Sequence, residues 1–137
     1  MKCLVCHQLI VINRFKEVLS IQSPLLCVSC QNQMIRKKGG LLFEENEWLK
    51  SVIERLNKGD IILTKLFINS FYVEIKRRLK YQHQIYILDY SANSPYPWMV
   101  ILLDQVKQKL TPLERESVQL LLIKEVNSDR QCIMMMS

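Results

Sequence analysis

The chain is poor in the residues that interrupt regular structure. It has three glycines and four prolines among its 137 residues, and no low-complexity tract or internal repeat. Hydrophobic residues make up 49% of the chain, which is enough to form a buried core. These features exclude a disordered scaffold and predict a folded protein of one ordinary domain, with or without a small appendage.

Long apolar runs are also missing. Runs such as residues 98–103 and 120–123 fall far short of the roughly 20 residues that a membrane-spanning helix needs. The amino terminus carries charges where a secretory signal would need an apolar core. We therefore expect a cytoplasmic protein without a membrane span. In that reducing compartment, paired cysteines are more often metal ligands than disulfides.

The groups that build active sites are scarce as well. The chain has only two histidines, and we find no glycine-rich phosphate loop and no recognisable pairing of a nucleophile with a base. The sequence therefore favours a non-catalytic protein. A thiol redox protein is the enzyme alternative that the cysteines leave open.

Four of the five cysteines follow a regular spacing. Cys3 and Cys6 form one C-x-x-C turn, Cys27 and Cys30 form another, and 20 residues separate the two turns. Two such turns supply the tetrahedral sulfur set that suits Zn²⁺, and a closed set of four sulfurs leaves no position for substrate. The spacing therefore predicts a structural Zn²⁺ site. The alternatives are metal-free thiols, iron in place of zinc, and ligation by His7 in place of one cysteine.

The pattern of apolar residues predicts two regions. Residues 1–38 are expected to form a zinc ribbon with a short strand near residues 9–12, and residues 41–137 a helix-rich α/β domain. Helices are predicted over 44–57, from a cap at Asp60 to residue 79, over 96–110, and from a capping box at Thr111; a buried strand is predicted over 85–90. The predicted fold class is α+β and helix-rich, a small four-cysteine zinc ribbon followed by a mainly helical domain with at least one buried strand.

The excess of positive charge indicates an acidic partner. The formal net charge is +6 and the pI is about 9.1. Nucleic acid is the commonest candidate partner and an anionic membrane surface the next, and the alternative is that the charge only provides solubility. The cations near residues 76–80 have a second explanation, because positive charge also stabilises the carboxyl end of a helix. The candidate nucleic-acid contacts are Arg36, Lys37, Lys38, Lys76, Arg77, Arg78, Lys80 and Tyr81.

The two cysteine turns have neighbours that carry a family resemblance. Cys3-Leu4-Val5-Cys6-His7-Gln8 and Pro24-Leu25-Leu26-Cys27-Val28-Ser29-Cys30 resemble the amino-terminal zinc ribbon of the competence protein F family, and residues 48–60 are similar in kind to the segment that follows. Members of that family assist the uptake of single-stranded DNA. The resemblance covers the first half of the chain, because the phosphoribosyltransferase-type phosphate loop of the family is not found here.

Three functions follow from these observations. The first is a non-catalytic zinc-ribbon accessory protein that binds nucleic acid, with single-stranded DNA and a role in DNA uptake or processing implied by the resemblance. The alternative is a protein–protein adaptor that uses the ribbon and the apolar tail at residues 133–136, whose composition does not decide whether it packs or binds a partner. The third is a divergent, inactive phosphoribosyltransferase-like protein.

Overall fold

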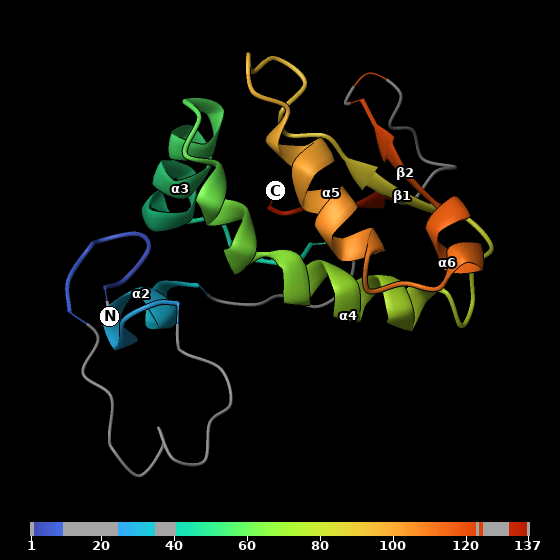
Figure 1. Cartoon of the computed structure of the whole chain (residues 1–137), viewed down its shortest axis with the longest axis horizontal. Coiled ribbons are helices and arrows are strands. Elements are labelled where there is room, and N and C mark those ends of the chain that lie inside the picture. The colour runs from blue at the N-terminus through green and yellow to red at the C-terminus, as the bar shows by residue number, and fades with distance from the viewer. Residues whose placement is uncertain (1, 10–24, 35–40, 123, 125–131, 137) are drawn as a thin grey trace, which may run out of the picture.

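A parallel β-sheet forms the centre of the larger region. In the computed structural model, which describes residues 2–9, 25–34, 41–122, 124 and 132–136, the sheet has three strands in the order β2-β1-β3. The strands are β1 (Ile85–Leu88), β2 (Val118–Leu121) and β3 (Cys132–Ile133). Helices lie beside this sheet, and the amino-terminal segment that carries the cysteines lies at one end of the molecule (Figure 1). The predicted α+β, helix-rich fold class is confirmed.

Alternate residues of β1 face two different apolar clusters. Ile85 and Ile87 belong to the main core, together with apolar side chains of helices α4 (Ile68–Arg78) and α5 (Trp98–Lys107), which lie side by side. Leu88 belongs to a second, smaller cluster on the other face of the sheet. The central strand is therefore apolar on both faces, as parallel strands usually are. The expectation of a buried strand near residues 85–90 is confirmed.

Helix α3 (Glu47–Asn57) confirms the prediction for residues 44–57. The side chain of Asn46 accepts a hydrogen bond from Leu49 N at 2.7 Å and so caps the amino end of the helix. The helix stops at Gly59, whose φ of +107° favours glycine, and a Cβ there would lie within 3.1–3.3 Å of the Tyr96 ring.

The single helix predicted from Asp60 to residue 79 is wrong in two respects. The segment divides at Phe67 into the 3₁₀-helix η1 (Ile61–Leu66) and helix α4. The tighter 3₁₀ turn places residues three apart on one side, which lets Leu63 and Leu66 both be buried. The carboxylate of Asp60 makes no cap hydrogen bond, because it binds Arg55 instead.

The predicted capping box at Thr111 is present, but the helix that it begins is short. Helix α6 (Pro112–Glu116) starts with reciprocal hydrogen bonds between Thr111 and Glu114 and ends after five residues. The chain then enters β2. Between them, α5 and α6 supply the long connection that two parallel neighbours need.

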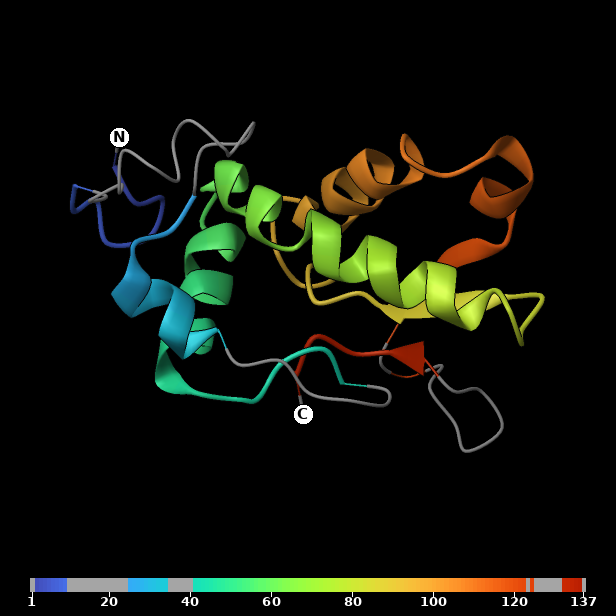
Figure 2. The ribbon, with the colours of Figure 1, turned by 90° about the horizontal axis from the view of Figure 1, so that it is seen from below.

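The apolar tail packs into the core. Ile133 and Met135 are fully buried, and Ile133 pairs with Ile87 of β1. Beyond β3, Leu42 N and Phe43 N donate to the carbonyls of Met134 and Met135, both at 2.9 Å, so the start of the larger region lies beside its end (Figure 2). The tail is thus part of the sheet edge.

Two of the predicted segments fall largely outside the described residues. These are the strand near residues 9–12, of which only Leu9 is described, and the candidate nucleic-acid contacts at residues 36–38. Leu9 forms an isolated antiparallel bridge with Lys2. In the described part of the chain, no helix is long and apolar enough to cross a membrane.

Candidate metal centre

The four cysteines of the two C-x-x-C turns meet in one cluster. The sulfur atoms of Cys3, Cys6, Cys27 and Cys30 all lie within 4.8 Å of one another, and the Cys6 and Cys27 sulfurs are 3.5 Å apart. Tetrahedral Zn²⁺ with bonds of about 2.3 Å places its sulfurs roughly 3.8 Å from each other. The cluster therefore has the size and the chemistry to hold a metal ion, and His7 is not part of it.

The first turn folds back on itself around Cys3. Cys3 N donates to Gln8 O at 2.8 Å, and His7 N donates to Cys3 O at 3.0 Å. The turn closes through His7, which adopts a left-handed φ of 62° that ordinarily favours glycine. Burial raises the pKa of the Cys3 thiol, but backbone N–H groups, chiefly those of Cys6, Cys27 and Val5, outweigh burial and lower it to about 6.

The second turn opens helix α2 (Val28–Gln33), in which Cys30 is buried. Gln31 steadies the turn, because its backbone N donates to Cys27 O at 2.9 Å and its side-chain Nε2 to Leu26 O at 2.8 Å. Burial raises the pKa of the Cys30 thiol to about 12, and the indole N–H of Trp48 acts in the opposite direction. That indole nitrogen is buried and makes no hydrogen bond within the described structure.

Without a cation the cluster therefore holds thiols in opposed environments. Backbone N–H groups lower the pKa of the Cys3 thiol, whereas burial raises the pKa of the Cys30 thiol. A coordinated divalent cation removes that conflict, because a thiol that binds a metal loses its proton. The donor set fits a soft or borderline cation such as Zn²⁺.

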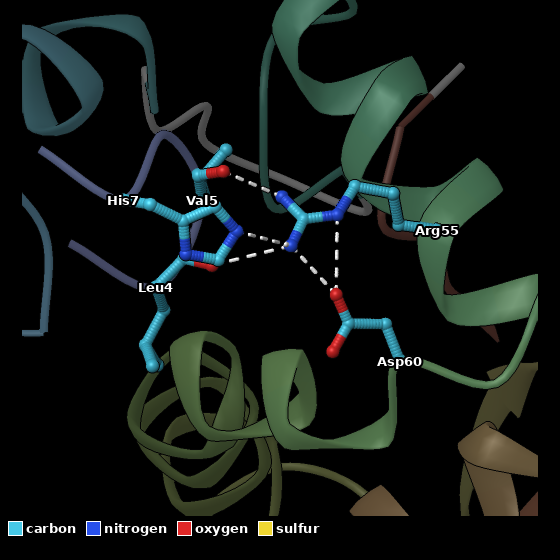
Figure 3. A network of polar contacts seen from close by, with 5 residues as sticks. All are labelled: Leu4, Val5, His7, Arg55 and Asp60. Atoms are coloured by element: carbon cyan, nitrogen blue, oxygen red, sulfur yellow. Dashed lines mark hydrogen bonds and ion pairs between the residues drawn. The ribbon is translucent and has the colours of Figure 1, made fainter. Parts of the chain in front are cut away.

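An arginine outside the cysteine segment holds the first turn in place. Arg55 of α3 donates through Nη1 to Val5 O at 2.6 Å and through Nη2 to Leu4 O at 3.4 Å (Figure 3). The same guanidinium binds Asp60 Oδ2 through Nε at 3.1 Å and Nη2 at 2.6 Å. Its Nη2 also lies 3.5 Å from His7 Nε2. The predicted site did not include Arg55, since a charge on the polar side of an amphipathic helix gives no signal of such a contact.

Three of the candidate nucleic-acid contacts take part in ion pairs within the protein. Lys76 binds Glu114 at 2.8 Å, and Arg77 and Arg78 bind Glu74 at 2.5 and 3.0 Å. Arg78 is buried. These contacts support the structural explanation of the basic cluster at the end of α4.

The remaining candidates are either exposed or not described. Lys80 and Tyr81 lie at the surface just after α4, and Tyr81 is 82% exposed. Arg36, Lys37 and Lys38 lie outside the described residues. A further cation that the sequence prediction missed joins this region, because Lys109 Nζ lies 5.8 Å from the centroid of the Tyr72 ring.

Comparison with protein-family models, curated proteins and solved structures finds no match for this chain. The resemblance to the competence protein F family therefore stays a prediction from the residues quoted above.

Proposed function

We propose that Cys3, Cys6, Cys27 and Cys30 bind one Zn²⁺ with a structural role. The observation that carries this proposal is the approach of all four sulfurs to within 4.8 Å of one another. A closed sulfur set supplies folding free energy and offers no coordination position to a substrate. Elemental analysis of the purified protein tests it, with about one zinc per chain as the expected result.

We further propose that the protein is a non-catalytic accessory protein that binds single-stranded nucleic acid, with DNA favoured by the family resemblance. The net charge of +6 supplies the attraction. Tyr72 and Lys76 are four residues apart on α4, Lys80 lies just after the helix, and Lys109 lies over Tyr72. Together with exposed Tyr81, these residues form a surface of cations and aromatic rings, which we call the α4 stripe.

The α4 stripe has the composition of a single-strand binding surface. Cations contact phosphates, and aromatic faces stack on bases without regard to sequence. Lys80 has no ion pair within the described structure, whereas Lys76 shares its charge with Glu114. Lys80 and Lys109 are therefore the cations of the stripe from which we expect the largest contributions.

Anisotropy of a fluorescent single-stranded oligonucleotide at several salt concentrations tests the second proposal. Each lost phosphate contact lowers the salt dependence by about 0.7 log unit per log unit of salt. The variant Lys80→Glu with Lys109→Glu should bind more weakly and with a slope smaller by about 1.4. A charge-matched control at α3, Lys50→Glu with Lys58→Glu, should keep the native slope, and absence of binding at low salt would contradict the proposal.

The adaptor alternative loses one of its two elements. It relied on an apolar tail available to a partner, but Ile133 and Met135 are fully buried in the core. A partner would have to use the ribbon surface alone. A pull-down from nuclease-treated lysate that depends on the ribbon would favour the adaptor over nucleic-acid binding.

A further inference from the structure

We propose that Arg55 is a positioning residue for the metal centre, which holds the first C-x-x-C turn in its metal-binding shape from outside the turn. The inference rests on the proposed Zn²⁺ site. It adds to that site the hydrogen bonds from Arg55 to the backbone between Cys3 and Cys6, which the spacing of the cysteines does not predict. It predicts that the metal affinity of the amino-terminal ribbon depends on a side chain of the larger region.

The geometry of the peptide bond links Arg55 to the sulfur of Cys3. In a planar trans peptide the carbonyl oxygen and the N–H of the next residue point in opposite directions. Arg55 binds the carbonyls of Leu4 and Val5, and the N–H groups of those same peptides belong to Val5 and Cys6. Both N–H groups lie on the Cys3 side of the turn, where they lower the pKa of the Cys3 thiol. Arg55 and Cys3 therefore hold opposite sides of the same peptide groups.

Arg55 is itself held in a fixed orientation. Helix α3 ends in a turn in which Asp60 N donates to Arg55 O at 3.0 Å and Gly59 N to Leu56 O at 3.1 Å. This turn places the Asp60 carboxylate against two nitrogens of the guanidinium. A guanidinium clamped by one carboxylate presents its remaining donors in a set direction, which a lysine could not do.

Arg55 acts on the turn through its hydrogen bonds, because Asp60 balances its charge. Its guanidinium lies against the turn that supplies two of the four sulfurs. Groups that bind and orient metal ligands from outside commonly change metal affinity by about 10- to 100-fold when they are removed. Arg55 is placed to act in this way.

Helix α3 also contacts the helix that carries Cys30. Asn46, which caps α3, donates through Nδ2 to Gln33 O at 2.6 Å, at the carboxyl end of α2. The start of α3 thus contacts the helix of one cysteine pair, and its end contacts the turn of the other. The metal centre is in this sense completed by the helix that follows it in the chain.

Competition with a chromophoric chelator measures Zn²⁺ affinity in the full-length protein and tests the inference. Arg55→Ala should weaken zinc binding by about 10- to 100-fold. Arg55→Lys keeps the positive charge but lacks the several N–H donors of the guanidinium, and it should weaken zinc binding less. The matched control is Arg115→Ala, because Arg115 also donates to two backbone carbonyls, those of Lys107 and Leu110 at 2.7 and 3.2 Å, away from the cysteines. The control should lose stability without losing zinc affinity.

Binding of Co²⁺ gives a readout that a purely structural role would not move. The sulfur-to-cobalt absorption should shift in Arg55→Ala and stay native in Arg115→Ala. Native affinity and a native spectrum in folded Arg55→Ala would overturn the inference, and if that variant does not fold, the same result in Arg55→Lys would do so. Failure of the unaltered protein to bind zinc would instead reject the metal site itself, and this inference with it.

Discussion

The two regions of the molecule are stabilised in different ways. The larger region has a core of large, fully buried side chains, among them Trp98, Phe43, Phe67 and Phe71. In the described part of the ribbon, the buried apolar residues are three of the metal-site cysteines and Leu26. Burial of apolar surface stabilises the first region, whereas we propose that the second gains stability from a metal ion held by its four cysteines and from polar contacts with α3. The few buried residues of the ribbon join the main core, against which Leu4, Val5 and Met34 also pack, so the ribbon has little apolar burial of its own.

The largest expected effect comes from removing two of the sulfurs. Changing both Cys27 and Cys30 to Ser should abolish zinc binding, which in sites of this kind supplies on the order of 10 kcal/mol or more. Hydrogen exchange should then lose protection in residues 25–34 and keep it in α5. Unchanged protection in residues 25–34 would show that the ribbon is held without the metal.

A substitution in the core of the larger region should lower the stability of the fold and leave zinc binding unchanged. Leu102 is buried in α5, and Leu102→Ala should lower the free energy of unfolding by about 2–5 kcal/mol. The zinc affinity of the folded protein should not change. Val100→Ala is the control on the same helix, because Val100 is exposed and its truncation should change stability by less than about 0.5 kcal/mol. A loss of zinc affinity in folded Leu102→Ala would contradict the view that the two regions are stabilised in different ways.

The parts that the sequence predicted correctly are those determined by short-range patterns. The 3.6-residue period of α3, the β-rich run of β1 and the capping box at Thr111 are local signals, and each element starts within three residues of its predicted position. The grouping of the four cysteines was predictable because two C-x-x-C turns can share one ion.

Long-range contacts account for what the sequence could not predict. Strand β3 is two residues long and acquires its conformation by pairing with β1. The local sequence around Cys132 and Ile133 does not predict this pairing. Residue Asp60 has the character of a helix cap, but it binds Arg55 because the glycine turn folds it back. Nothing in the spacing of Arg55 reveals that Val5, 50 residues away, is its partner.

A smaller effect should follow from the Glu74 ion pairs on α4. Burial disfavours the charged carboxylate, but hydrogen bonds from Arg77 and Arg78 outweigh it and lower the pKa of Glu74. A lowered pKa stabilises the fold above the ordinary glutamate range and ceases to do so as the pH falls through the folded-state value. Glu74→Gln should therefore cost about 1–3 kcal/mol at neutral pH, and its urea stability should depend less on acid pH. Parallel acid profiles for both proteins would contradict this.

The smallest expected effect concerns His7. Its left-handed φ of 62° is costly for a residue with a Cβ, and glycine adopts it freely. His7→Gly should strengthen zinc binding by about 0.5–1 kcal/mol, or roughly two- to fivefold. His7→Ala keeps the Cβ and should show no such gain. Equal affinities of the glycine and alanine variants would mean that the backbone at this position stores no strain.

The most direct test of the account is the metal content of the natively purified protein, measured by elemental analysis together with a count of sulfhydryls that react under native conditions. The account predicts about one zinc per chain, with Cys3, Cys6, Cys27 and Cys30 unreactive until a chelator removes the metal. A folded protein that contains no metal, and whose four cysteines react at once, would contradict it.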